Sequence, residues 1–160
     1  MPSHTSLLNK WYRRTSVTQR AHYLSAAHFS KRKYWLGGPA AILATTVGTS
    51  VFATLSSKPD PWAQILMGLA SVAAAALTSL QTLLGYAERA EKHRLAGAKY
   101  GALGRELEEM LSSEAEINTI QIANVRERLD ALALESPDTP QSIYYKAGAG
   151  ELEAPGVQTG

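Results

Sequence analysis

Residues 34–57 read YWLGGPAAILATTVGTSVFATLSS and residues 61–87 read PWAQILMGLASVAAAALTSLQTLLGYA, with Lys58-Pro59-Asp60 between them. Both segments lack Asp, Glu, Lys and Arg, and they contain 24 and 27 residues. A helix of about 20 apolar residues is long enough to cross roughly 30 Å of hydrocarbon. We therefore predict transmembrane helices at 34–57 and 62–87, joined by a short outer turn at 58–61.

Apolar helices of this length also occur as buried hairpins in soluble proteins. A chain of 160 residues has too little other structure to cover two helices that are apolar on all sides. A cleaved signal peptide fits poorly, because the first segment is longer than the usual stretch of about 7–15 residues. We expect an all-α membrane protein: a two-span transmembrane helical hairpin with cytosolic helices and a flexible C-terminal tail.

Basic residues are concentrated before the first segment. Residues 1–33 contain seven Lys or Arg and no Asp or Glu, and Lys31, Arg32 and Lys33 directly precede the predicted span. The positive-inside rule then places both termini in the cytosol and Trp62 at the outer interface. Because membrane topology accounts for this charge, we expect no direct nucleic-acid binding. The chain has no cysteine, which excludes disulfides, thiolate metal sites and a cysteine nucleophile.

The N-terminal region, residues 1–33, allows two interpretations at its start. Leu8, Trp11 and Tyr12 lie among basic residues, which suits a membrane surface and equally suits a frayed terminus. Ser16 is a suitable N-cap for a helix over 16–33. We expect Pro39 in the first turn of the first span, where a missing N–H is tolerated.

Small and polar residues recur along one side of the second apolar segment at steps of four and three. They are Gln64, Gly68, Ser71, Ala75, Thr78, Thr82 and Gly85, with Gln81 beside them. This row serves either helix packing, which small residues favour, or the lining of a pore, and both interpretations stay open. In the first segment, a second row suited to close packing comprises Gly37, Ala41, Ala44 and Gly48.

Neither apolar segment contains an ionisable residue, whereas proton relays and ion-coupled transporters usually need one. A passive pore has no such requirement. The four histidines, at positions 4, 22, 28 and 93, show no metal-ligand spacing, and no phosphate loop or catalytic triad pattern occurs. We therefore expect neither an enzyme nor a bound metal or cofactor. We expect His93 to pack or to hydrogen-bond at an interface, and a pH-sensing role stays open.

Residues 88–135 are expected to form cytosolic helices. With no proline between Trp62 and Leu134, the second span should continue past Glu88 without a break. Apolar residues then recur at helical spacing in two groups, which predicts a helical hairpin or a coiled-coil assembly. They are Tyr100, Leu103, Leu107 and Met110 or Leu111, followed by Ile117, Ile120, Val125, Leu129 and Leu132.

Three further features belong to the region after the second span. Gly97, Gly101 and Gly104 predict either tight packing against a neighbouring helix or a bendable segment. The basic residues Arg89, Lys92, Arg94 and Lys99 suit receipt of a phosphate-bearing signal or an ordinary solvated face next to a membrane. Residues 136–160 are rich in proline and glycine, which predicts a flexible tail.

Several stretches carry a resemblance to a known family. They are Ala21-His22-Tyr23, Ala26-Ala27, Leu36-Gly37, residues 68–72 (GLASV), residues 80–82 (LQT) and residues 86–94 (YAERAEKHR), with Tyr100 and Leu103 after them. Over about residues 11–115 the chain resembles the SLATT family of bacterial two-transmembrane-helix effectors. The tail from Ser136 has no counterpart in this resemblance.

The resemblance implies a membrane effector of a bacterial anti-phage defence system. It implies a homo-oligomeric pore in the inner membrane, a ring of four or more subunits, that depolarises the cell when triggered. It also implies a partner encoded nearby: a nucleotide-signal synthase, a nucleotide sensor or a reverse transcriptase. A non-conducting membrane anchor that presents a cytosolic helical platform is the alternative, and a holin-like lysis protein is a third.

Overall fold

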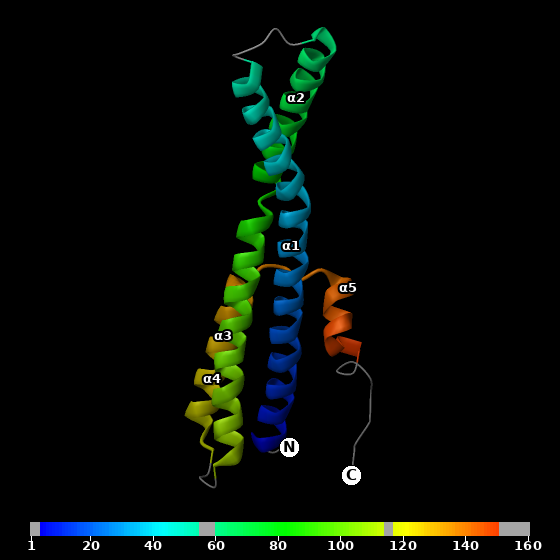
Figure 1. The fold of residues 1–160 in the computed structure, drawn as a ribbon. Coiled ribbons are helices and arrows are strands. Elements are labelled where there is room, and N and C mark those ends of the chain that lie inside the picture. The colour runs from blue at the N-terminus through cyan, green and yellow to red at the C-terminus, as the bar shows by residue number, and fades with distance from the viewer. Residues whose placement is uncertain (1–3, 55–59, 114–116, 151–160) are drawn as a thin grey trace. The chain divides into compact units, whose positions relative to one another are not determined.

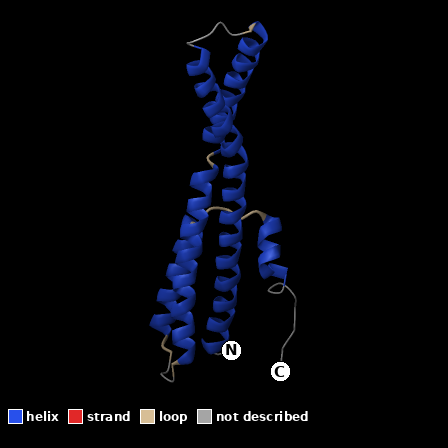
Figure 2. Ribbon diagram, in the orientation of Figure 1, coloured by secondary structure: helices blue, strands red, loops and turns tan. Residues whose placement is uncertain are grey.

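The computed structural model describes residues 4–54, 60–113 and 117–150, and these residues form helices and no strand (Figures 1 and 2). The helices are α1 (His4–Thr54), α2 (Pro61–Leu84), α3 (Tyr86–Ser112), α4 (Thr119–Glu135), α5 (Gln141–Tyr144) and the π-helical turn η1 (Tyr145–Ala149). The predicted all-α class is therefore confirmed for the described residues. The chain divides into two compact units, His28–Arg89 and Met1–Ala27 with Ala90–Gly160. We call them the hairpin unit and the bundle unit.

In the hairpin unit, the second half of α1 and α2 run antiparallel and cross each other (Figure 1). Ala40 of α1 and Ala74 of α2 are the buried residues of this pair. The half-buried residues that flank them define the packed face of each helix. These are Leu36, Gly37, Leu43, Val47 and Ser50 on α1, and Met67, Ala70, Leu77, Gln81 and Leu84 on α2.

Among the described residues, one helical run is long and apolar enough to cross a membrane, and it lies in Pro61–Ser112, which comprises α2 and α3. This run includes the predicted second span. The predicted first span, 34–57, extends beyond the described part of α1 and stays a prediction. So does most of the predicted outer turn at 58–61, because Lys58 and Pro59 lie outside the described residues.

Helix α1 corrects two expectations about its boundaries. Ser16 is not an N-cap, because α1 begins at His4 and the Ser16 hydroxyl donates to the Tyr12 carbonyl within the helix. Pro39 lies in the interior of α1 rather than in a first turn. Proline cannot donate to the carbonyl four residues earlier, but helices in apolar surroundings accommodate it when neighbouring groups satisfy the freed carbonyl.

The expected unbroken helix beyond the second span is also wrong, because the chain turns at Gly85. Gly85 has φ 57° and ψ 31°, and its N–H donates to the Gln81 carbonyl at 3.3 Å. This left-handed conformation ends α2 in the manner of a glycine C-cap. At the other end of α2, the Asp60 carboxylate accepts from the Trp62 N–H at 3.0 Å, and Pro61 occupies the first turn.

The bundle unit has an apolar core formed by α1, α3 and α4. Leu8, Leu107 and Val125 form one buried cluster, and Tyr100, Leu103 and Leu132 form another. The predicted apolar face of α3 and the return of α4 along it are confirmed. The prediction for Ile120 is wrong, because its side chain is 78% exposed. Of the two interpretations left open for the N-terminal region, the frayed terminus is wrong, because Trp11 and Tyr12 lie in α1 and pack against the first cluster.

The glycines of α3 allow close packing of α1. A Cβ atom added at Gly97 would lie 3.2 Å from the Tyr23 ring, and one at Gly101 would lie 2.6 Å from the Gln19 amide nitrogen. At Gly104 the nearest atom would be a methyl carbon 3.7 Å away. Tight packing is therefore confirmed at Gly97 and Gly101.

The predicted flexible tail at 136–160 is partly wrong. The chain is helical from Gln141 to Ala147 and kinks at Gly148, which has φ 106° and ψ 16°, and the Ala147 side chain is fully buried. Residues 151–160 lie outside the described residues. Pro137 follows the end of α4, and Pro140 directly precedes α5. These prolines separate the two helices but do not prevent α5 from forming.

Candidate functional site

The small and polar row of the second apolar segment lies on an exposed side of α2. Its members Gln64, Gly68, Ser71, Ala75, Thr78 and Thr82 are all exposed. Nothing lies within 4 Å of a Cβ atom added at Gly68. The Thr78 and Thr82 hydroxyls donate to the carbonyls of Ala74 and Thr78, at 2.9 and 3.0 Å. The two threonine hydroxyls are thus satisfied within α2, and the exposed row does not pack against the other described residues.

Two predicted members are separate from this row. The Gln81 side chain lies against Gly37 of α1, because a Cβ atom added at Gly37 would be 3.2 Å from both Gln81 amide atoms. Gln81 therefore takes part in the packing of α1 against α2. Gly85 forms the left-handed turn between α2 and α3.

The small row of α1 divides in the same way. Gly37 is half-buried against Gln81, whereas Ala41, Ala44 and Gly48 are exposed, and nothing lies within 4 Å of a Cβ atom added at Gly48. The hydroxyls of this segment also donate to carbonyls of their own helix. These are the hydroxyls of Thr45, Thr46, Thr49 and Ser50.

The exposed rows of α1 and α2 lie on one side of the hairpin. At 3.6 residues per turn, each row is displaced by about 100° from the packed face of its helix, in the same rotational sense. Since a pair of antiparallel helices is related by a two-fold axis, equal displacements place both rows on the same face. We call this face the small-residue face. It comprises Ala41, Ala44 and Gly48 of α1 with Gln64, Gly68, Ser71, Ala75, Thr78 and Thr82 of α2.

Large apolar side chains occupy the opposite side of the hairpin, which we call the bulky face. Trp35 and Ile42 of α1 are 75% and 68% exposed. Leu69 and Leu80 of α2, also exposed, lie on the same side by the same helical geometry. The hairpin unit therefore has two faces of different character, one of small residues and hydroxyls and one of bulky apolar groups.

The four basic residues suggested as a signal-receiving face differ in their partners. Arg94 pairs with Glu91 at 2.7 Å, and Lys99 pairs with Glu135 at 2.6 Å. These hydrogen bonds lower the pKa of both carboxyl groups. Arg89 and Lys92 are exposed, and Arg89 belongs to the hairpin unit while the other three belong to the bundle unit. The predicted face is therefore partly neutralised within the chain.

A buried histidine pair joins α1 to α3 in the bundle unit. The Nδ1 atoms of His22 and His93 are 2.9 Å apart, and both residues are 2% exposed. One imidazole must donate its Nδ1–H to the unprotonated Nδ1 of the other. Burial and the neighbouring His93 lower the pKa of His22 to about 4, and burial lowers the pKa of His93. Both rings are therefore neutral near pH 7.

Tyr100 contacts this pair, and a buried serine lies one turn away on α1. The Tyr100 ring stacks on His22 with ring centroids 5.5 Å apart, and burial raises the Tyr100 pKa. Ser25, one turn after His22 on α1, is fully buried, and its hydroxyl has no hydrogen-bond partner among the described residues. Sequence reasoning anticipated an interface role for His93 but did not identify His22 as its partner.

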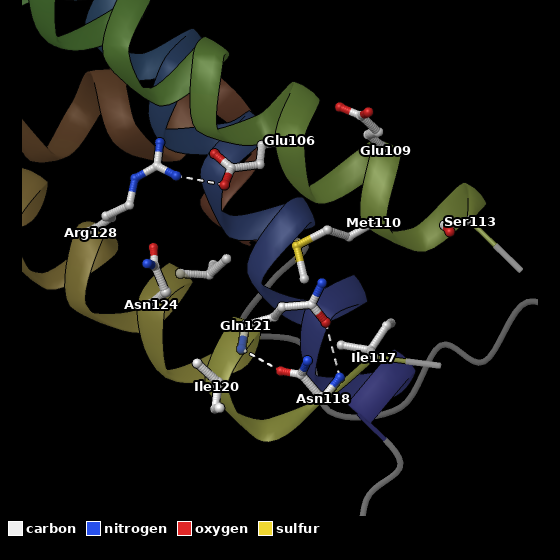
Figure 3. Close-up of a pocket in the computed structure, with 11 residues that line it drawn as sticks. Glu106, Glu109, Met110, Ser113, Ile117, Asn118, Ile120, Gln121, Asn124 and Arg128 are labelled. Atoms are coloured by element: carbon white, nitrogen blue, oxygen red, sulfur yellow. Dashed lines mark hydrogen bonds and ion pairs between the residues drawn. The ribbon is translucent and has the colours of Figure 1, made fainter. Parts of the chain in front are cut away.

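The largest cavity among the described pockets lies where α3 and α4 diverge, with a volume of about 630 Å³ (Figure 3). Two of its charged groups are engaged, because Arg128 pairs with Glu106 at 2.5 Å. Asn118 and Gln121 form a reciprocal capping box at the start of α4. Four of the polar residues that line the cavity are thus paired with one another in the local fold.

The comparisons with known proteins identify a family. The family model "SMODS and SLOG-associating 2TM effector domain family 4" matches residues 5–151. This range extends the resemblance beyond residues 11–115 and includes α5 and η1. No match was found among curated proteins or among solved structures. The family match covers most of the chain, and the protein belongs to the SMODS and SLOG-associating two-transmembrane effector domain family 4.

Proposed function

We propose that this membrane effector of a bacterial conflict or anti-phage system forms an oligomeric pore that permeabilises the inner membrane when triggered. The two-faced hairpin is the observation that carries the proposal. Bulky apolar groups suit contact with lipid tails, whereas small residues permit close approach of helices from another subunit. Hydroxyls and Gln64 on the same small-residue face suit contact with water.

A ring of subunits follows from the size of the hairpin. Two helices cannot enclose a channel, so several copies must surround it, and rotational symmetry closes such an assembly. We propose four or more subunits, with 34–57 and 62–87 spanning the membrane and both termini in the cytosol. The absence of ionisable residues in these segments suits passive flow with poor ion selectivity.

The trigger that we propose is a nucleotide signal or a partner protein from the same defence system. The family description supports this, because it names association with SMODS and SLOG proteins. The bundle unit, with its ordered core and exposed charges, is the part that would receive such a signal. A synthase, a sensor or a reverse transcriptase encoded nearby is the candidate source.

Ion leakage from liposomes containing the full chain tests this proposal, together with a mass measurement of the detergent-solubilised particle. We expect leakage from a defined oligomer in the presence of the trigger. Ser71→Leu should block leakage without changing the particle mass, because it fills the small-residue face. Val72→Leu, one residue away and off that face, is the matched control and should leak normally.

Two outcomes would contradict the pore. A monomeric particle that never leaks would favour the non-conducting membrane anchor. Loss of the oligomer in Ser71→Leu would assign the small-residue face to packing alone. In the anchor case, an unrelated two-span hairpin should replace residues 34–87 without loss of defence.

A further inference from the structure

A cluster of aromatic and basic side chains lies at the end of the hairpin unit next to the Gly85 turn. The Tyr86 ring stacks on Phe29 of α1, with centroids 6.1 Å apart and planes inclined by 25°. The guanidinium carbon of Arg32 lies 5.9 Å from the Tyr86 ring centroid. Arg89 follows Tyr86 by three residues on α3, and residues three apart are neighbours on a helix surface. Arg32 of α1 thus lies over the Tyr86 ring, and Arg89 of α3 lies one helical turn from Tyr86.

No carboxylate of the described residues neutralises the charges of these two arginines. Both residues are exposed, and neither forms a salt bridge within residues 4–54, 60–113 and 117–150. In the bundle unit, by contrast, Arg94, Lys99 and Arg128 each pair with a glutamate. A site with two free guanidinium groups attracts an anion, and a guanidinium binds phosphate oxygens in a bidentate manner.

The position of the cluster along the chain indicates which anion it meets. Only Lys33 separates Arg32 from the charge-free segment 34–57, and only Glu88 separates Arg89 from the charge-free segment 61–87. With these segments in the membrane, both guanidinium groups lie at the level of the lipid headgroups. Basic pockets at this level bind anionic lipids, and each cation near the surface adds to the attraction.

We propose that Arg32 and Arg89 form a binding site for the headgroup phosphate of an anionic phospholipid. The Tyr86 ring holds the Arg32 guanidinium by a cation–π contact, and Phe29 holds the ring. The left-handed turn at Gly85 sets where α3 begins, and therefore where Tyr86 lies. The inference requires the membrane insertion on which the proposed function rests, but it does not require ion conduction.

Lipid titration of the purified full chain tests the site. The protein is placed in phosphatidylcholine vesicles with increasing phosphatidylglycerol, and the thermal unfolding midpoint is recorded. We expect phosphatidylglycerol to raise the midpoint of the unmodified chain. In Arg32→Gln/Arg89→Gln, the phosphatidylglycerol fraction needed for half of the shift should rise by about 30-fold, and in each single variant by about 5-fold.

Control variants separate the site from general surface charge. Arg13→Gln/Arg20→Gln removes two exposed cations of the bundle unit and should leave the titration unchanged. Arg32→Lys/Arg89→Lys keeps the charge that sets membrane orientation. The phosphatidylglycerol fraction that it needs for half of the shift should lie between the values for the unmodified chain and for the glutamine double variant. All variants should unfold at the same midpoint in pure phosphatidylcholine.

Three results would overturn the proposal. The first is an unmodified chain that does not respond to phosphatidylglycerol. The second is an equal loss of response in Arg13→Gln/Arg20→Gln, which would indicate diffuse electrostatic attraction. The third is an equal rise in midpoint with inorganic phosphate in pure phosphatidylcholine, which would assign the two arginines to a soluble phosphate compound.

Discussion

The hairpin unit and the bundle unit use the same residue types in opposite ways. In the bundle unit, Leu107 is fully buried and Gly101 meets the Gln19 side chain of α1. In the hairpin unit, Leu83 is 82% exposed, and no described residue lies within 4 Å of a Cβ atom added at Gly68. The difference is explained if the bundle unit is surrounded by water and the hairpin unit by lipid and by other subunits. In lipid, exposed leucine carries no penalty, and small residues mark contact surfaces.

Replacement of leucine should give the largest difference between the two units. Leu107→Ala removes a fully buried side chain from the first core cluster and should lower the free energy of unfolding by about 2–5 kcal/mol. Leu83→Ala changes an exposed side chain of α2 and should change it by less than about 0.5 kcal/mol. Chemical denaturation in detergent measures both. An equal loss of unfolding free energy in the two variants would contradict the conclusion that Leu107 lies in a core and Leu83 does not.

Acid should destabilise the bundle unit through the histidine pair. The pKa of His22 is lowered from 6.5 to about 4 in the folded chain, so the unfolded state takes up protons first as the pH falls. The stabilisation is complete above pH 6.5 and is lost as the pH falls towards 4, by about 2–3 kcal/mol. His22→Gln should flatten this dependence, which stability measurements from pH 7.5 to 4 detect. The exposed His28, replaced by Gln, serves as the control, and an identical effect there would contradict the account.

Alanine at glycine positions should change stability by about 1 kcal/mol, with a sign set by the space beside each glycine. Gly97→Ala should destabilise the bundle unit, because its Cβ would lie 3.2 Å from the Tyr23 ring. Gly104→Ala meets only ordinary contact at 3.7 Å and should gain about 1 kcal/mol from helix propensity. Gly68→Ala should leave both the folded chain and the particle mass unchanged, because nothing among the described residues lies within 4 Å of the added Cβ atom. Thermal unfolding and particle mass, measured on the same samples, check the three variants.

The smallest effect is expected from surface ion pairs of the bundle unit. Lys99→Gln removes the contact with Glu135, in which both side chains are more than half exposed. Such pairs contribute about 0–1 kcal/mol, and 0.5 M salt should abolish the difference from the unmodified chain. A loss above 2 kcal/mol in the denaturation experiment would show that this pair fixes α4 on α3.

Sequence periodicity predicted the residues that are buried at regular intervals along one face of a helix. Leu103 and Leu107 were predicted on the buried face of α3, because an amphipathic pattern indicates which face of a helix is hidden from water. Helix boundaries were predicted less well. Gly85 ends α2 although no proline is present, since glycine tolerates both helix interiors and left-handed caps. Ser16 has the chemistry of an N-cap, but its hydroxyl bonds within the longer helix α1.

The residues of the candidate site were predicted from the sequence, but the surface that they form with α1 was not. The row from Gln64 to Thr82 is visible in the sequence, but its position relative to α1 depends on the rotation of two packed helices. For the same reason, the sequence pattern does not predict that Gln81 points towards α1. His22 and His93 are 71 residues apart, and their contact depends on the packing register of α1 against α3, which no local pattern reports. The pairing of Arg32 with Tyr86 depends on the Gly85 turn.

Cysteine scanning of α2 tests the central claim most directly, because the chain contains no cysteine of its own. Single replacements at Ser71, Ala75 and Thr78 probe the small-residue face, and those at Leu69, Val72 and Leu80 probe the remaining surface. The measurement is disulfide crosslinking between subunits in native membranes, together with labelling by a water-soluble thiol reagent. We predict crosslinking or labelling at the first three positions and neither at the last three. Reaction of Leu69→Cys and Leu80→Cys in place of Ser71→Cys and Ala75→Cys would contradict the two-faced hairpin.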